Sequence, residues 1–200
     1  MRRLPILMLT LALGGCGNTV SSLHYVPSRA VQTAPGPSIG GVTATDQRKE
    51  APTRLATIMG GFGNPLKTLD TAKPVKDEVA DAFMEGLRVR GLIVSGRPAP
   101  FNLTLVIRKF DADMIMGRTA RIDLTMAVVD SASRIVFQDS MTDSQSDFKF
   151  LQTGVLADIA DLKVLSQVVL DRTVDRLLDN PAFRNAITPT SSGSRQGRIN

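Results

Sequence analysis

Few residues in this chain of 200 could carry out chemistry at a defined site. Cys16 is the single cysteine, so no disulfide can form within the chain. His24 is the single histidine, and it stands beside Tyr25 in a stretch interrupted by prolines. A serine–histidine–acid triad needs a histidine that a rigid scaffold holds in place. We therefore interpret His24 as a solvated residue of a flexible segment.

The loop from Gly61 to Thr68 has the first glycine and the Lys67-Thr68 pair of a phosphate-binding loop at the right spacing. However, Leu66 occupies the position before the lysine, where such a loop needs a glycine to wrap its backbone around the phosphate. Pro65 also removes a backbone amide that would donate to the anion. We therefore expect a turn here, with no nucleotide and no other cofactor or metal ion bound.

Carboxylates are more numerous in the second half of the chain. Paired acids can hydrolyse glycosides, but only at a defined separation within a cleft. The aspartates in question fall at expected strand ends and turns, where this residue commonly forms local hydrogen bonds. We interpret them as solvated and keep an envelope hydrolase as an alternative function. They are Asp111, Asp113, Asp139, Asp143 and Asp147.

The first residues have the layout of a secretory signal peptide. Arg2 and Arg3 give a positive start, the run from Leu4 to Leu13 is apolar, and two glycines lead to Cys16. A spanning helix needs roughly 20 apolar residues, and this run is about half as long. We predict that residues 1–15 are a signal peptide that is removed.

The residues Leu13-Gly14-Gly15-Cys16 resemble the lipobox of bacterial lipoproteins. The resemblance implies cleavage before Cys16, a diacylglyceryl thioether on its sulfur and an acyl chain, such as palmitate, on its amino group. Several acyl chains give durable membrane anchoring. By the rules of this class, Gly17 at the next position implies sorting to the outer membrane, with the domain in the periplasm of a host that has two membranes.

The formal net charge of +5 includes Arg2 and Arg3, so removal of the signal peptide lowers it to +3. This mild charge does not require nucleic acid as a partner, and export argues against it. An apolar fraction of 42% is sufficient for one folded domain. We predict a lipidated amino terminus and linker over residues 16–38, a domain over 39–187 and a disordered tail over 188–200.

Within the domain, residues 39–45 and 55–59 are predicted strands that could form a hairpin. A helix is expected from Pro74 to the stop at Gly91, with acidic residues in its first turn. Its apolar residues recur at every fourth position, at Val75, Val79, Phe83 and Leu87.

Alternation of apolar and polar residues predicts strands over 101–108 and 120–128, and a turn at 130–133 leads to a third strand near 135. An amphipathic helix is expected over 157–179, with Asp171 and Asp175 off its apolar side and an end before Pro181. The predicted fold class is α+β, an antiparallel sheet covered on one face by two helices.

The chain as a whole resembles the YajG-type family of uncharacterised bacterial lipoproteins. The resemblance rests on the lipobox and on four segments of the mature chain. It implies the fold and the location of the protein more than an activity. The segments are Ile39-Gly40-Gly41-Val42, Asp46-Gln47-Arg48, the glycine-rich stretch 60–67 and Leu87-Arg88-Val89-Arg90-Gly91-Leu92.

Met114, Ile115 and Met116 interrupt the strand alternation at an expected hairpin tip. Flexible thioethers there could form an adaptable interaction surface, although packing in the core is the commoner role of such residues.

The absence of a coherent catalytic set, together with the anchor, favours a non-enzymatic binding or accessory module in envelope assembly, maintenance or transport. Its partner would be the membrane through Cys16, with an envelope protein, peptidoglycan or lipid bound by the domain. Two alternatives remain, namely a peptidoglycan- or lipid-binding protein without a protein partner, and the envelope hydrolase.

Overall fold

The structure, a computed structural model, describes residues 17–31, 33, 38–93, 96, 99–114, 117–147 and 158–188. The predicted signal peptide, Cys16 and residues 189–200 of the predicted tail lie outside this range.

The described residues fold into seven strands and three helices, so the predicted α+β class is confirmed. The described sheet is mixed, however, because three of its strand pairings are parallel, and the prediction of an antiparallel sheet is correct for the other three. In chain order the elements are β1 (Gly17–Ser21), β2 (Ile39–Asp46), β3 (Arg54–Met59), β4 (Pro65–Thr71), α1 (Val75–Val89), β5 (Phe101–Met114), β6 (Arg118–Asp130), β7 (Ile135–Asp147), α2 (Ile159–Leu178) and α3 (Pro181–Ile187).

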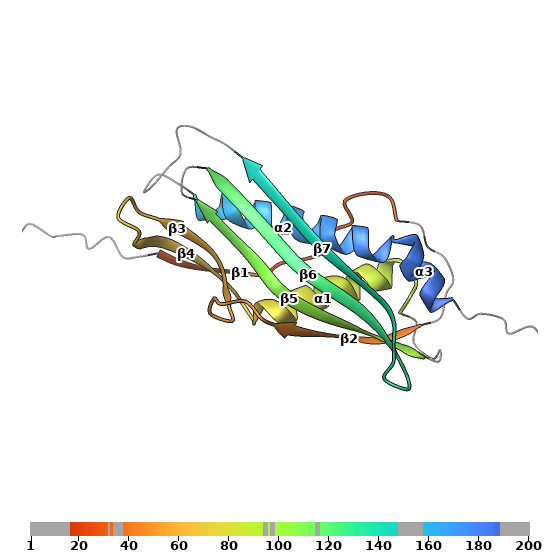
Figure 1. The fold of residues 1–200 in the computed structure, drawn as a ribbon. Helices are drawn as coiled ribbons and strands as arrows, with labels where there is room; N and C mark the ends of the chain where they lie inside the picture. The colour runs from red at the N-terminus through yellow and green to blue at the C-terminus, as the bar shows by residue number, and fades with distance from the viewer. Residues whose placement is uncertain are drawn as a thin grey trace, which may run out of the picture.

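Strand β5 is the centre of the sheet, whose order is β1-β4-β3-β5-β6-β7 (Figure 1). On one side β5 pairs with β6 along its whole length. On the other side its first half pairs with β2 and its last three residues pair with β3, both in parallel. Strands β2 and β3 therefore lie end to end along the same side of β5 and do not pair with each other. The predicted hairpin between them is wrong.

Arg48 fills the junction where β2 leaves β5 and β3 joins it. Its side chain is fully buried and pairs with Asp46 at 2.9 Å. One terminal nitrogen donates to the carbonyl oxygens of Arg54 and Phe110, at 2.8 and 3.0 Å. Buried carbonyls need such donors, and the guanidinium replaces the strand partner that is missing at this break.

Helices α1 and α2 lie side by side behind the sheet and cover one face of it (Figure 1). The alternate residues of β5 and β6 that face the helices are buried, as are Val75, Val79, Phe83 and Leu87 of α1. The predicted stripe of α1 is thus confirmed. The expected end of α2 before Pro181 is also correct, but the same proline begins α3, whose Phe183 packs on Phe137 of β7.

The predicted flexible linker is wrong for residues 17–31. Gly17–Ser21 form β1, which pairs in parallel with β4 at the edge of the sheet. The extended residues that follow alternate, with Leu23 and Tyr25 buried and His24 exposed between them. This two-residue period buries one side of the segment against the helices, so the segment is part of the domain.

Candidate functional site

The N-terminal segment, residues 22–29, crosses helices α1 and α2, and each helix binds its backbone. Glu78 of α1 accepts from the Leu23 amide at 3.1 Å. On α2, Gln167 accepts from the His24 amide at 3.1 Å. The two helices themselves approach closely at Gly86, where an added Cβ would lie 2.6 Å from a methyl carbon of Val174. The segment therefore closes over a tight helix pair.

Arg90, at the C-terminal end of α1, lies fully buried beneath this segment. All five of its N–H donors have acceptors. Nε and one Nη2 hydrogen bond reach Asp179 at 2.8 and 2.9 Å, and the other Nη2 bond reaches Asp175 at 2.8 Å. Nη1 donates to the Tyr25 hydroxyl at 2.9 Å and to the Gly86 carbonyl at 3.0 Å. A fully satisfied guanidinium of this kind joins α1, α2 and the N-terminal segment.

Asp175 is the acid at the centre of this cluster, and it is 1% exposed. Tyr25 donates its hydroxyl proton to one carboxylate oxygen, and Ser28 donates from both its amide and its hydroxyl to the other. Burial alone would raise the pKa of Asp175, but hydrogen bonds from Ser28, Tyr25 and Arg90 hold it below its usual value. Burial raises the pKa of Tyr25 to about 12, so both groups keep their ordinary charge at neutral pH.

Asp171 lies one helical turn before Asp175 and is in the opposite situation. Its carboxylate accepts from the Val26 amide at 3.2 Å and from Gln167 at 2.8 Å, without a cationic partner in those bonds. Burial therefore raises its pKa from 3.8 to about 6. The expectation that Asp171 and Asp175 avoid the packed side of α2 is wrong, because the N-terminal segment covers that side of the helix.

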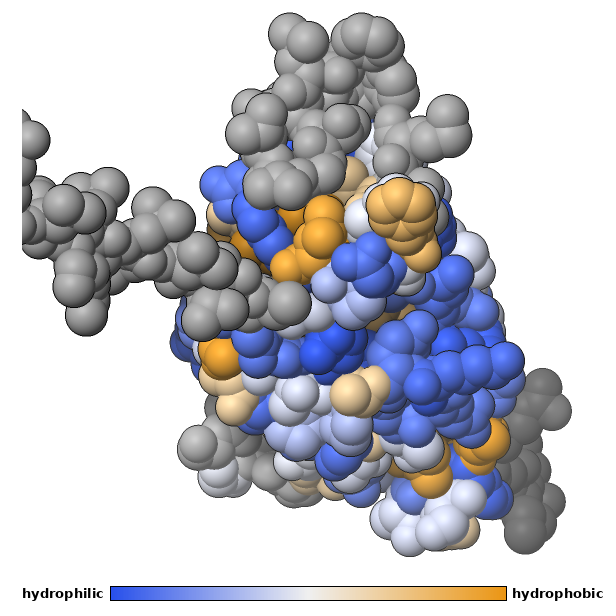
Figure 2. Space-filling model, turned by 90° about the vertical axis from the view of Figure 1, so that its left-hand side faces the viewer, coloured by the Kyte–Doolittle hydropathy of each residue, from blue (hydrophilic) through white to orange (hydrophobic). Residues whose placement is uncertain are grey.

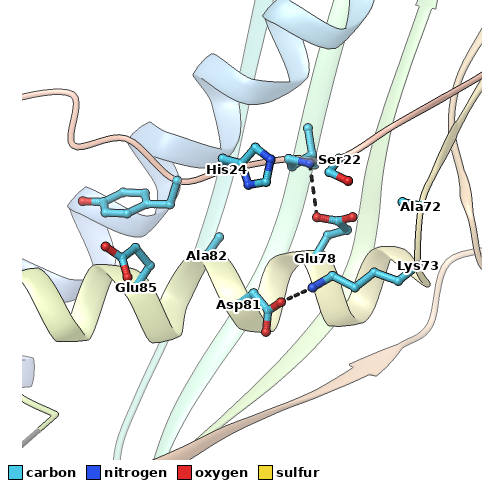
Figure 3. A pocket seen from close by; sticks show the side chains of 10 residues that line it. Ser22, His24, Ala72, Lys73, Glu78, Asp81, Ala82 and Glu85 are labelled. Carbon is cyan, nitrogen blue, oxygen red and sulfur yellow. Dashed lines mark hydrogen bonds and ion pairs between the residues drawn. The ribbon is translucent and has the colours of Figure 1, made fainter.

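A cavity of about 620 Å³ opens between the N-terminal segment and α1. Figure 3 shows Glu78, Asp81 and Glu85 rising from α1, with Ser22 and His24 on the segment that runs above them. The lining residues are Ser22, Leu23, His24, Tyr25, Ala72, Lys73, Glu78, Asp81, Ala82 and Glu85.

The walls of this cavity carry three carboxylates and one ammonium group. Lys73 is paired with Asp81, and this hydrogen bond raises the pKa of Lys73. Glu78 is 2% exposed, and its second oxygen, Oε1, has no hydrogen-bond partner within the described part of the chain. Glu85 is held by Arg88, so the unpartnered oxygen of Glu78 is the acceptor here that suits a cationic or donor-rich ligand group.

The five aspartates named in the sequence lie on two faces of the sheet and do not converge. Asp111 and Asp113 are on the open face, where both pair with Arg121. The other three face the helices. Asp139 accepts from Asn180 at 2.8 Å, Asp143 pairs with Arg172 at 2.9 Å, and Asp147 pairs with Arg118 at 2.9 Å.

The predicted interaction surface at Met114, Ile115 and Met116 is wrong for its first residue. Met114 is 2% exposed, because it continues the buried alternation of β5 and packs in the core. Ile115 and Met116 lie outside the described residues.

Lys67 and Thr68 belong to β4 and lie before α1, so the glycine-rich loop does not lead into a helix as a phosphate-binding loop would.

Sequence reasoning missed Arg90, because a cation at the end of a helix is already explained by the helix dipole. It also missed the cavity, which depends on the N-terminal segment being folded. Two signals were available. Leu23 and Tyr25 alternate with polar residues, and α2 carries acids at Asp171, Asp175 and Asp179, four residues apart on one side.

No family model matches the chain, and no curated protein is related to it at a significant level. Among solved structures it is similar to protein XCC0632 from Xanthomonas campestris, of family DUF330, with 15% identity, a TM-score of 0.58, and coverage of 84% of this chain and 96% of that one. The two proteins therefore share a fold.

Two further likenesses have TM-scores below 0.5. A minor lipoprotein from Acinetobacter baumannii has 12% identity and a TM-score of 0.40 over 57% of this chain and 89% of that one. Lipoprotein GNA1162 from Neisseria meningitidis has 10% identity and a TM-score of 0.28 over 80% and 99%. In the part of the chain that the structure describes, no helix has the length and apolar character to span a bilayer.

Proposed function

We propose that this chain is an envelope lipoprotein, anchored by acyl chains on Cys16, whose domain is a non-enzymatic binding or accessory module. The observation that carries the proposal is that Gly17, the residue after the lipobox cysteine, already lies in a strand that is paired in the sheet. Cleavage before Cys16 would leave a mature chain whose second residue is already paired with β4.

This arrangement would hold the domain against the membrane. Consecutive Cα atoms are about 3.8 Å apart, so Gly17, which is paired in the sheet, would lie within that distance of the acylated residue. With Gly17 rather than aspartate after Cys16, we place the anchor in the outer membrane and the domain in the periplasm.

Two observations support binding over catalysis. The five aspartates of the hydrolase alternative lie on opposite faces of the sheet and do not converge, and all but Asp111 hold a hydrogen bond from an arginine or asparagine. The cavity beside the N-terminal segment, by contrast, is lined by Glu78, whose Oε1 has no hydrogen-bond partner within the described part of the chain. A binding module would use this cavity to receive a cationic or donor-rich group of an envelope component.

A photo-crosslinking amino acid at position 24 tests the binding function in cells. His24 lines the cavity and is exposed, and Ala132 in the turn after β6 is an exposed control position at another site. The proposal predicts an adduct with a defined envelope protein, lipid or glycan from position 24 and none from position 132.

The hydrolase alternative predicts a different set of results. Replacement of Asp111, Asp113, Asp139, Asp143 and Asp147 by alanine would then abolish turnover of an envelope substrate in a protein that still folds. Turnover by the wild-type chain, with no adduct from position 24, would contradict the binding function.

A further inference from the structure

We infer that the turn between β3 and β4 inserts Phe62 into the lipid interface beside the anchor. The inference rests on the proposed lipidation of Cys16 and adds a second membrane contact, made by the folded domain itself. Phe62 is fully exposed, at 102%, although it is a large apolar side chain. Glycines flank it on both sides and offer no side chain to cover it.

The turn has a defined conformation that presents this ring. The Gly60 amide donates to the Asn64 carbonyl at 2.7 Å, and the Gly63 amide donates to the Gly60 carbonyl at 3.0 Å. Gly63 has a φ of +77°, which a residue with a side chain rarely adopts. A closed turn of this kind holds Phe62 at the tip at little further cost in conformational entropy.

Single exposed apolar residues are common on protein surfaces and need no special explanation. The position of Phe62 relative to the anchor is what distinguishes it. Strand β1 runs parallel to β4, with Gly17 opposite Lys67, and β4 begins two residues earlier at Pro65. At about 3.3 Å per residue, the turn therefore starts roughly 7 Å beyond Gly17, on the side from which the chain arrives from Cys16.

Acyl chains on Cys16 would bring this same end of the molecule to the bilayer. Figure 2, which faces the left-hand end in Figure 1, shows apolar side chains among polar ones there. Interfacial segments bury their apolar side chains about 5–10 Å into the boundary between headgroups and acyl chains. A turn that projects roughly 7 Å past the first strand residue would reach that depth. The occupant of this surface is thus the lipid itself.

The absence of tryptophan makes the contact directly measurable. A Phe62→Trp variant contains a single tryptophan at the tip of the turn. The matched control is Ile135→Trp, because Ile135 is 61% exposed but lies at the opposite end of the sheet. The strand pairings establish this. Ile58, beside the turn, lies opposite Met114, and so does Arg118, the first residue of β6. Ile135 lies opposite Val129, near the last residue of β6.

Both full-length variants would be purified from membranes and reconstituted into phosphatidylethanolamine–phosphatidylglycerol vesicles that contain a brominated phosphatidylcholine. The expected result is an emission of Phe62→Trp that is shifted to shorter wavelength and quenched by the brominated lipid. The emission of Ile135→Trp should be the same with and without bromine. Urea unfolding of both variants verifies that the domain is intact.

Mass spectrometry of the same samples separates the two ways of failing. If the chains carry acyl groups on Cys16 but the Phe62→Trp emission is solvent-like and unquenched, this inference is overturned while the anchor stands. That result is also expected if a partner protein covers the turn, since the vesicles contain only lipid. If no acyl group is present, the proposed function and this inference both fail.

Discussion

Tyr25 and Arg90 are 65 residues apart in the chain, and their side chains are joined by a buried hydrogen bond of 2.9 Å. The hydroxyl that accepts from Arg90 also donates to Asp175 of α2. One tyrosine therefore ties the first residues after the proposed anchor to both helices behind the sheet. Any force transmitted through the proposed anchor would act on the folded core, since Gly17–Ser21 are paired in the sheet and Leu23 and Tyr25 are buried.

Removal of the Arg90 charge should destabilise the domain strongly. An Arg90→Met variant leaves Asp175 buried without its cation, and loss of one partner from such a pair typically costs about 3–5 kcal/mol. Urea unfolding should show this loss in the free energy of unfolding. The control is Arg88→Met, two residues earlier at the end of α1, where an exposed arginine pairs with Glu85. Equal midpoints for the two variants would show that the buried cluster contributes nothing.

The raised pKa of Asp171 predicts that part of the stability falls as the pH rises. Its folded pKa of about 6 exceeds the value of 3.8 expected when unfolded, so the folded protein binds the proton more tightly between these values. The free energy of unfolding should therefore decrease from about pH 4 to about pH 6 on account of this group.

An Asp171→Asn variant isolates that contribution. The amide oxygen can still accept from the Val26 amide, but it does not ionise. The free energy of unfolding of the variant minus that of wild type should rise by up to about 3 kcal/mol across this window and then stay constant above it. Unfolding curves at several pH values provide the measurement. A difference that is the same at every pH would rule out Asp171 as its source.

The close approach of the helices at Gly86 should not tolerate a methyl group. An alanine Cβ there would lie 2.6 Å from Val174 and 2.9 Å from Leu178, and valine has little freedom to move away. Overpacking of this kind typically costs about 1–3 kcal/mol, which opposes the better helix propensity of alanine.

Gly61→Ala is the matched control for this substitution, because nothing lies within 4 Å of the added atom. Thermal unfolding should place its midpoint close to that of the wild-type protein, and that of Gly86→Ala well below. A Gly86→Ala variant as stable as wild type would mean that the helices are less closely packed than described.

Local periodicity was sufficient to predict the elements that bury one clear face. Helix α1, with Val75, Val79, Phe83 and Leu87, and the paired strands β5 and β6 follow directly from it. Strand β4 was missed because Pro65 and Gly63 indicate a turn, whereas its pairing with β3 comes from a neighbour that alternation does not reveal. The parallel partners of β5 are equally non-local, since β2 and its partner residues are about 60 positions apart.

The candidate site was hidden for the same reason. Prolines and glycines near His24 are typical of a linker, and only the groove between α1 and α2 gives Leu23 and Tyr25 a place to be buried. Arg90 and Asp175 are 85 residues apart, so neither local spacing nor charge pattern predicts their pairing. The anchor is different, because the residues that predict it are contiguous.

The anchor is also the central claim, and the mass of the N-terminal peptide tests it most directly. For the wild-type protein we expect a peptide that begins at Cys16 and carries the mass of a diacylglyceryl group and an amide-linked acyl chain. A Cys16→Ser variant should yield no acylated peptide and should not be processed at this position, while its domain still folds. An unmodified Cys16 in the wild-type chain, or normal processing and membrane attachment of the serine variant, would contradict the account.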